Sequence, residues 1–160
     1  MLTLIRCDDR LIHGQCMTVI TKEYDIARII VVDDTTANNP ILKTVFTTAV
    51  PPSMSAKVYT VDEAVPEITA AREDNVKTLV LMKDPTVYNQ LLEKMPDLPK
   101  TLNVGPMSSR KDTISVTKTI HLLPKEAEAV KELAAKGVDV YFQQVPAEHK
   151  VTWAEVADRF

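Results

Sequence analysis

The amino-acid sequence predicts an α/β protein with a single doubly wound, mostly parallel sheet of about six to seven strands and helices on both faces. Short apolar runs rich in β-branched residues alternate with helix-forming segments along the whole chain. The apolar runs are continuous, which is typical of parallel strands that are buried on both sides. Because no linker, repeat or low-complexity segment interrupts the pattern, we expect one domain over residues 1–160.

Composition limits the class of protein. The 160 residues are 45% hydrophobic and 26% charged, as in an ordinary globular domain. A formal charge of −3 gives no reason to expect a nucleic-acid partner, which would require a basic face. No apolar stretch approaches the roughly 20 residues that span a bilayer, and no basic leader precedes the first strand. We therefore expect a cytoplasmic protein.

The first part of the chain predicts two strands with a helix between them. Residues 1–5 form a short apolar strand, and residues 15–24 can form one helix. Residues 27–32 are a β-branched run bounded by charge, as in a strand covered on both faces. The charged segment 6–15 therefore lies where a parallel strand passes into a helix. Open α/β sheets bind their ligands at this edge.

Prolines mark the next helix. Residues 40–49 are predicted to be helical, since Pro40 suits a first turn and Pro51 with Pro52 stops the helix. A third short strand is expected at residues 57–60.

A capping box predicts the start of the following helix. Thr60 and Glu63 have the required spacing, although Pro66 must break one hydrogen bond in that helix or move its start downstream. Residues 76–82 are the fourth predicted strand. Asp84 then caps a helix that continues to residue 92.

The remaining elements follow the same alternation. We expect strands at 101–104, 115–122 and 138–142, an amphipathic helix at 124–136 closed by Gly137, and a terminal helix capped by Thr152 and Glu155.

Segment 6–15 carries the candidate chemistry. Arg6 and Arg10 are four residues apart, and a loop that folds back can aim both at one multiply charged group. His13 precedes a helix start, and Gly14 leaves backbone N–H groups open to an anion. Such an imidazole can be a general base, a metal ligand or a phosphoryl acceptor. The arginines favour the phosphoryl acceptor, because they would repel a metal dication.

Each of these charged residues also has a structural interpretation. Arg10 is predicted to bind phosphate, with Arg6 as a weaker second ligand, but either can instead pair with Asp8 or Asp9. Asp9 can orient the imidazole or restrain Arg10, or it can be a turn residue that bonds its own backbone. The apolar pair at positions 11 and 12 can either form the centre of a docking patch or anchor the loop inward.

Two further polar segments offer alternatives. Asp33 and Asp34 can bind a divalent metal, but we favour a strand-end pair that caps loop backbone. The loop at 105–110 can close over a phosphoryl group through Ser109 and Arg110, or it can be an ordinary surface loop.

The cysteines and the other histidines are expected to be structural. Cys7 and Cys16 are predicted to be free thiols, with Cys16 packed as a small apolar side chain rather than reactive. His121 lies in an apolar run and is expected to be structural, and His149 is expected to be exposed. No cysteine or histidine cluster has zinc spacing, so we expect no metal and no cofactor.

Residues 8–15, DDRLIHGQ, resemble the signature loop of the IIB component of the mannose/fructose/sorbose-type sugar phosphotransferase system. Weaker similarities follow in the family's order at 29–34, 103–107, 137–138 and 144–146. Two positions depart from the pattern. Pro106 stands where a second glycine is usual and removes a possible N–H donor, and Ile20 stands where the family often has tryptophan.

The resemblance implies that His13 takes a phosphoryl group from a phosphohistidine of the IIA component and passes it to a sugar. The expected partners are then phosphorylated IIA, the membrane IIC/IID permease and the sugar. The protein is expected to act transiently at the inner face of the membrane, and it can also form a homodimer. The expected site comprises His13, phosphate ligands Arg10, Arg6, Gly14 and Ser109, and an orienting Asp9. The alternative is a non-catalytic signalling module, either receiver-like or sensing a phosphorylated ligand.

Overall fold

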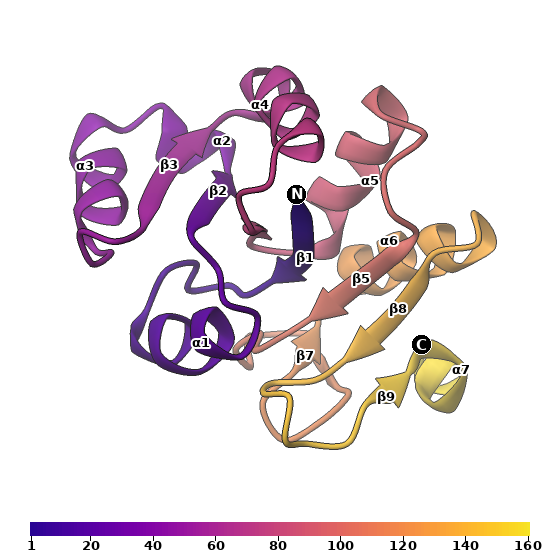
Figure 1. The fold of residues 1–160 in the computed structure, drawn as a ribbon. Helices are drawn as coiled ribbons and strands as arrows, with labels where there is room; N and C mark the ends of the chain where they lie inside the picture. The colour runs from indigo at the N-terminus through magenta and orange to yellow at the C-terminus, as the bar shows by residue number, and fades with distance from the viewer.

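The computed structural model describes all residues from 1 to 160 and contains a seven-stranded sheet in the order β3-β2-β4-β1-β5-β8-β9 (Figure 1). All neighbouring strands are parallel except β9, which runs antiparallel to β8. The predicted doubly wound, mostly parallel sheet is therefore confirmed. The strands of this sheet are β1 Leu2–Cys7, β2 Arg28–Val32, β3 Ser55–Tyr59, β4 Thr78–Met82, β5 Thr101–Val104, β8 Asp139–Phe142 and β9 Val151–Thr152.

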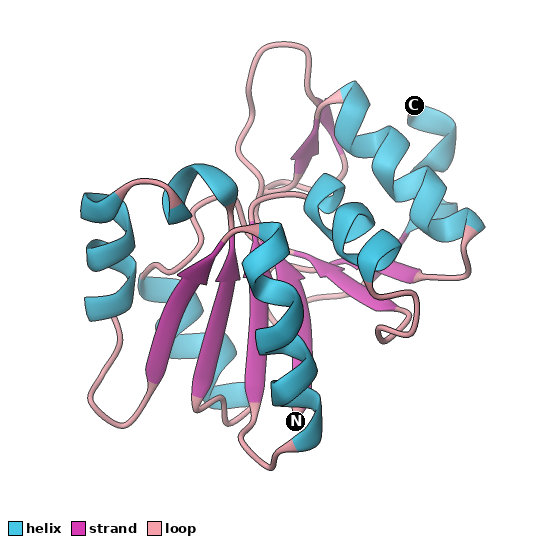
Figure 2. Cartoon of the chain, turned by 90° about the horizontal axis from the view of Figure 1, so that it is seen from above, coloured by secondary structure: helices cyan, strands magenta, loops and turns pink.

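Helices cover both faces of the sheet (Figure 2). The larger core cluster unites β1, β4 and β5 with the helices α4, α5 and α6, and the smaller one lies under the segment that follows β1. The helical elements are a π-helical turn Cys16–Ile20, α1 Thr21–Glu23, α2 Asp34–Ala37, α3 Pro40–Thr48, α4 Val61–Glu73, α5 Pro85–Lys94, α6 Pro124–Ala135, α7 Trp153–Val156 and a 3₁₀ turn Ala157–Arg159. None of these helices is both long and apolar enough to cross a membrane.

The predicted capping residues and the predicted glycine stop lie at the ends of the helices, as expected. Thr60 and Glu63 form the capping box of α4, and Pro66 lies inside that helix without moving its start. Asp84 caps α5 by accepting the backbone N–H of Thr86 at 2.8 Å. Gly137 ends α6 with a φ of +82°, a conformation that favours glycine.

Two strand predictions need correction. Residues 115–122 form a separate hairpin of β6 Ile114–Ser115 and β7 His121–Leu122, because the polar residues between them make a turn rather than extending a strand. In that turn the N–H of Val116 bonds the carbonyl of Ile120 at 2.8 Å. Strand β1 runs two residues further than expected, so that Arg6 belongs to the strand and not to the loop.

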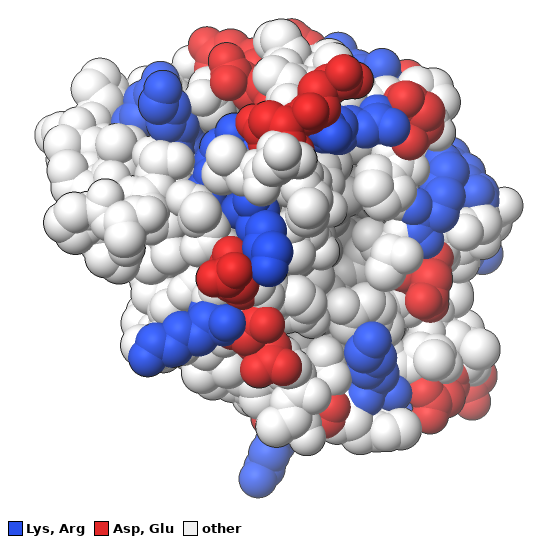
Figure 3. Space-filling view, viewed as in Figure 1, with Lys and Arg blue, Asp and Glu red and all other residues white.

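The surface mixes acidic and basic side chains, with few charges over α3 (Figure 3). None of the nine residues of α3 is buried, and Lys43 is its only charged residue. Ile41 and Val45 are 77% and 52% exposed. This helix contributes to the core mainly through the partly buried Phe46.

Candidate functional site

The loop after β1 lies at the carboxyl end of the sheet, between the ends of β4 and β5. The N–H of Asp8 bonds the carbonyl of Met82 at 2.9 Å, and the N–H of Asp9 bonds the carbonyl of Pro106 at 3.1 Å. The strand order therefore places the loop at the carboxyl edge of the sheet, where the sequence predicts a site. Pro106 contributes an acceptor here, although it lacks the N–H donor that a glycine would supply.

A histidine and a buried carboxylate form the centre of the site. The Nε2 atom of His13 lies 2.7 Å from Oδ2 of Asp8. The Asp8 side chain is fully buried, whereas the His13 side chain keeps 14% of its exposure. Because a carboxylate can only accept hydrogen bonds, Nε2 carries the proton and Nδ1 keeps its lone pair. The imidazole is thus held in the tautomer in which Nδ1 is the nucleophilic atom.

Asp9 does not orient the imidazole, and that prediction is wrong. Its Oδ2 accepts the backbone N–H of Ser108 at 2.7 Å and also the Ser108 hydroxyl. The turn bond is made instead by Asp8, whose Oδ1 accepts the N–H of Arg10 at 3.2 Å. Asp8 was missed as the partner of His13; its place directly after the buried strand was the one available signal.

Arg6 is a buried positioning residue, which corrects its expected role as a phosphate ligand. Its guanidinium donates to the side-chain oxygen of Asn103 and to the backbone oxygens of Gln143 at 3.3 Å and Gln144 at 2.8 Å. Burial lowers the pKa of Arg6, although Asp8, 3.7 Å away, opposes the shift. With 1% exposure it fixes the underside of the loop and does not reach an anion in solvent.

Glycine is required where β5 ends above this guanidinium. A Cβ at Gly105 would lie 2.5 Å from Cζ of Arg6 and 2.8 Å from the carbonyl oxygen of Cys7. The N–H of Gly105 also bonds that carbonyl at 2.8 Å, so the backbone has no room to retreat. Gly105 therefore allows the two loops of the site to approach each other.

The residues between Asp8 and His13 anchor the loop inward. Leu11 adopts a φ of +58°, which is uncommon for a side chain of this size, and it is 1% exposed. Ile12 is also buried, so the alternative of an exposed docking patch is contradicted. The π-helical turn Cys16–Ile20 follows, and turns of this type occur often at functional sites. Ile20 itself is buried in the smaller core cluster.

Arg10, Gly14 and Ser109 are exposed around the loop and remain predicted phosphate ligands. The guanidinium of Arg10 has no hydrogen bond or ion pair within the chain. Gly14 begins the helix after His13, with no atom within 4 Å of an added Cβ. A shallow depression beside the loop is lined by Asp9, Arg10, Pro106, Ser108, Ser109, Lys118, Thr119, His121 and Gln144.

Arg110 has a structural role. Its Nη2 lies 2.8 Å from Oε1 of the buried Glu126, and its Nε donates to the carbonyl of Ser108 at 3.0 Å. Arg110 therefore anchors the loop after β5 and is not free to close over an anion.

Asp33 and Asp34 cap backbone, as favoured. Oδ2 of Asp33 accepts the N–H of Thr36 at 3.0 Å and pairs with Lys83 at 3.3 Å. Oδ1 of Asp34 accepts the N–H of Val61 at 2.8 Å. No group of three or more histidine, cysteine, aspartate or glutamate side chains is arranged to hold a metal ion.

Neither cysteine offers a thiolate. Both are buried and unbridged. Burial raises the pKa of Cys16 to about 11 and that of Cys7 well above its ordinary value. His149 is exposed as expected, with 81% of its side chain accessible.

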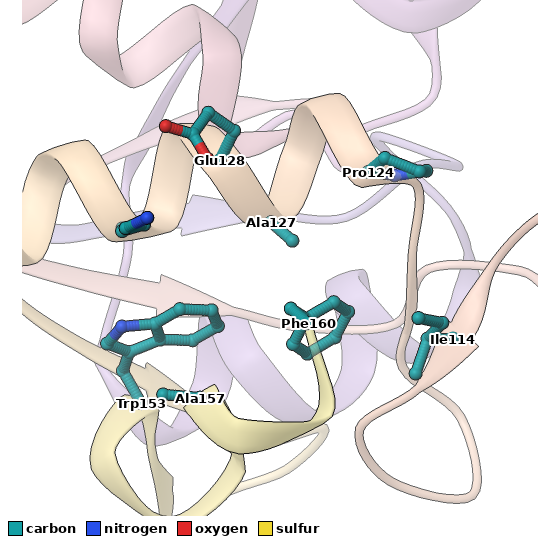
Figure 4. Close-up of a pocket in the computed structure, with 8 residues that line it drawn as sticks. Ile114, Pro124, Ala127, Glu128, Trp153, Ala157 and Phe160 are labelled. Carbon is teal, nitrogen blue, oxygen red and sulfur yellow. The ribbon is translucent and has the colours of Figure 1, made fainter.

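A cavity of about 470 Å³ lies between α6 and the C-terminal segment (Figure 4). It is mostly apolar, and the rings of Trp153 and Phe160 stack beside it with centroids 5.6 Å apart. No residue of the loop 8–15 lines it, so it is separate from the His13 site.

Comparison with known proteins points to one family. The profile of the family described as "PTS system sorbose subfamily IIB component" matches residues 2–159. The mannose-specific EIIAB component of Escherichia coli K12 is 31% identical over 98% of this chain, which spans only about half (48%) of that relative. The fructose-specific EIIB component of Bacillus subtilis is 28% identical over 97% of this chain and 94% of its own.

Solved structures agree with the sequence relatives. The IIBSor domain of the sorbose permease from Klebsiella pneumoniae superposes with a TM-score of 0.88 at 29% identity, covering 99% of this chain and 96% of that one. The structure of manxB from Thermoanaerobacter tengcongensis gives a TM-score of 0.85 at 30% identity, covering 100% and 96%.

Proposed function

This chain belongs to the sorbose subfamily of IIB components of the sugar phosphotransferase system, and on that premise we propose that His13 carries a phosphoryl group from a IIA component to a sugar. The donor is a phosphohistidine of IIA, and the sugar enters through membrane components IIC and IID. The protein works in the cytoplasm, transiently at the inner face of the membrane. Relatives named for mannose, fructose and sorbose support a hexose as the sugar.

The hydrogen bond of 2.7 Å between Nε2 of His13 and the buried Asp8 carries this proposal. It leaves the lone pair of Nδ1 to attack the phosphorus of the donor. The new P–N bond forms while the P–N bond to the donor imidazole breaks, and the donor ring keeps the electron pair. Asp8 stabilises the positive charge that develops on the His13 ring.

The second transfer reverses the roles. A sugar hydroxyl oxygen attacks the phosphorus while its proton passes to solvent water, and the P–N bond to His13 breaks with the electron pair returning to Nδ1. Arg10, Gly14 and Ser109 bind the phosphoryl oxygens during both steps. Guanidinium, N–H and hydroxyl donors suffice for this, because phosphoryl transfer depends mainly on positioning and charge stabilisation. No metal or cofactor takes part.

Phosphorylation of the purified chain tests the proposal. Incubation with ³²P-labelled phospho-IIA should label the chain, and the label should be lost in acid and survive base. His13→Ala should abolish labelling, whereas His149→Ala, which changes an exposed histidine outside the site, should not. An unlabelled wild-type chain, or a labelled His13→Ala variant, would contradict the assignment. A label that is lost in base as well as in acid would indicate an aspartyl phosphate and the signalling alternative.

A further inference from the structure

The depression beside the His13 loop has a third wall that the proposed mechanism does not use. The loop residues Asp9 and Arg10 form one side, the segment 106–109 after β5 forms another, and the turn of the β6–β7 hairpin supplies Lys118, Thr119 and His121. Gln144 links the depression to the segment after His13, since its side-chain N–H group donates to the side-chain oxygen of Gln15 at 3.0 Å. The depression thus adjoins the segment that follows the nucleophile.

We propose that Lys118 completes, with Arg10, an anion subsite that binds the oxygens of the phosphoryl group as it is transferred to and from His13. This inference rests on the proposed function, which supplies the phosphate. The β6–β7 hairpin thereby contributes to phosphate binding together with the loop 8–15 and the segment after β5.

The charge balance of the depression supports an anion. Neither Arg10 nor Lys118 makes a side-chain hydrogen bond or ion pair within the chain. The only carboxylate in the lining, Asp9, is already engaged through Oδ2 by the N–H and hydroxyl of Ser108. The depression is therefore lined by two unpaired cationic side chains, Arg10 and Lys118, and by one carboxylate that is already hydrogen-bonded. Guanidinium and ammonium groups in such a setting match phosphate oxygens.

The hairpin is held in place against the site. The N–H of Met107 bonds the carbonyl of Thr119 at 3.0 Å, and the N–H of His121 bonds the carbonyl of Met107 at 3.0 Å. On the other side, Nη1 of Arg159 donates to the carbonyl of Val116 at 3.0 Å. Lys118 therefore extends from an anchored turn, which lowers the cost of ordering it around a ligand.

The histidine of the hairpin is oriented as well. Nε2 of His121 lies 3.3 Å from the carbonyl of Lys118, so it donates its proton to that oxygen. This bond ties the ring to the turn that carries the lysine. His121 was expected to be structural, and this bond agrees with that role; its partly buried side chain also lines the depression.

Binding of inorganic phosphate to the full chain tests the subsite without a partner protein. In a ¹H–¹⁵N NMR titration, phosphate should shift the signals of residues 108–109 and 118–121. Lys118→Gln should weaken phosphate binding about tenfold, because one charge-assisted contact is lost. Lys111→Gln is the matched control, since Lys111 is exposed in the loop before β6 and does not line the depression. Equal affinity of Lys118→Gln and wild type would overturn the proposal.

The rate of labelling by phospho-IIA distinguishes transferred phosphate from free phosphate. Lys118→Gln should raise KM for phospho-IIA about tenfold with kcat changed less than threefold, since the lysine binds and does not react. An unchanged KM beside weakened phosphate binding would overturn the claim that the subsite receives the transferred group. A wild-type chain that binds phosphate but is never labelled would instead refute the proposed function and leave the subsite standing.

Discussion

The pairing of His13 with Asp8 determines which ring nitrogen is available. The two side chains approach to 2.7 Å, and the carboxylate is inaccessible to solvent. A buried carboxylate that fixes a histidine tautomer also stabilises the ring once it becomes cationic. Loss of the Asp8 carboxylate should therefore slow phosphoryl transfer to His13 more than it weakens binding of phospho-IIA.

Replacing Asp8 by asparagine should slow phosphorylation of His13 by roughly 10²- to 10⁴-fold, because the amide can bond the wrong tautomer and removes the charge. The measurement is the single-turnover rate of labelling by phospho-IIA. Asp9→Asn is the matched control, and we expect a loss of less than about tenfold, since Asp9 bonds Ser108 and not the imidazole. Equal labelling rates for the two variants would show that Asp8 does not assist phosphorylation of His13.

The two glycines of the site should respond differently to alanine. Gly105→Ala should lower the free energy of unfolding by about 1–3 kcal/mol, because its Cβ would meet Arg6 and the carbonyl of Cys7. Gly14→Ala should leave stability unchanged within about 0.5 kcal/mol or raise it, since its Cβ meets nothing within 4 Å and alanine favours a helix. Urea unfolding curves compare them; a similar loss for both would contradict the close approach at Gly105.

The sequence identified the reacting histidine but not its support. Two adjacent aspartates offer the same chemistry, and only the length of β1 decides which of them turns inward. Because the strand continues through Cys7, Asp8 is buried at its end and Asp9 points to the neighbouring loop. The same extension buries Arg6, whose charge had suggested a loop residue. A charged residue inside a parallel strand breaks the apolar pattern on which strand ends are predicted.

At the scale of elements, prediction succeeded where local chemistry decides. Capping boxes, prolines at first turns and the glycine after α6 depend on a few neighbouring residues, and all lie where expected. The prediction of one strand at 115–122 was wrong, because the β-branched residues of this segment suit a hairpin as well as a single strand. The fold of this segment is decided in part by hydrogen bonds to Met107, which lies outside it.

Pro66 gives a prediction for α4. It lies at the sixth position of the helix, where it removes one backbone hydrogen bond. Pro66→Ala should therefore raise the free energy of unfolding by about 1–3 kcal/mol, as measured in urea. Pro124→Ala is the control, because Pro124 occupies the first position of α6, where no bond is lost. A Pro66→Ala variant no more stable than Pro124→Ala would show that the helix has absorbed the proline without cost.

At the scale of the whole molecule, one ion cluster joins the N-terminus, the start of β2 and the end of α4. Asp74 bonds Arg28 at 2.8 and 2.9 Å and the amino group of Met1 at 3.0 Å. The hydrogen bonds from Arg28, then those from the N-terminus, hold the pKa of Asp74 well below its ordinary value. A carboxyl whose pKa is lowered by folding stabilises the protein above its unfolded pKa of about 4 and loses that effect as pH falls.

The acid limb of the stability curve should therefore depend on Asp74. Between about pH 4 and pH 2, Asp74→Asn should flatten the fall in urea midpoint that the wild type shows. Asp158→Asn, which removes an exposed carboxylate with no ion-pair partner, is the control. If the Asp74→Asn curve keeps the wild-type slope, the cluster does not contribute through this carboxyl group.

The general architecture was more predictable than the site. Alternating apolar runs and capped helices fix a parallel sheet, and the resemblance of the loop 8–15 gives the family that comparison confirms. Contacts between distant segments were not predictable, because they require strand order. The anchoring of the β6–β7 hairpin beside Arg10 is one such contact, and it is the one on which the anion subsite depends.

The most direct test of the central claim is the position of the phosphoryl group on the imidazole. Long-range ¹H–¹⁵N NMR of the ¹⁵N-labelled chain, recorded before and after phosphorylation, assigns the two ring nitrogens of His13. We predict that Nε2 carries the proton before the reaction and that Nδ1 carries the phosphorus after it. A phosphoryl group on Nε2, or on any residue other than His13, would contradict the role given to the bond between His13 and Asp8.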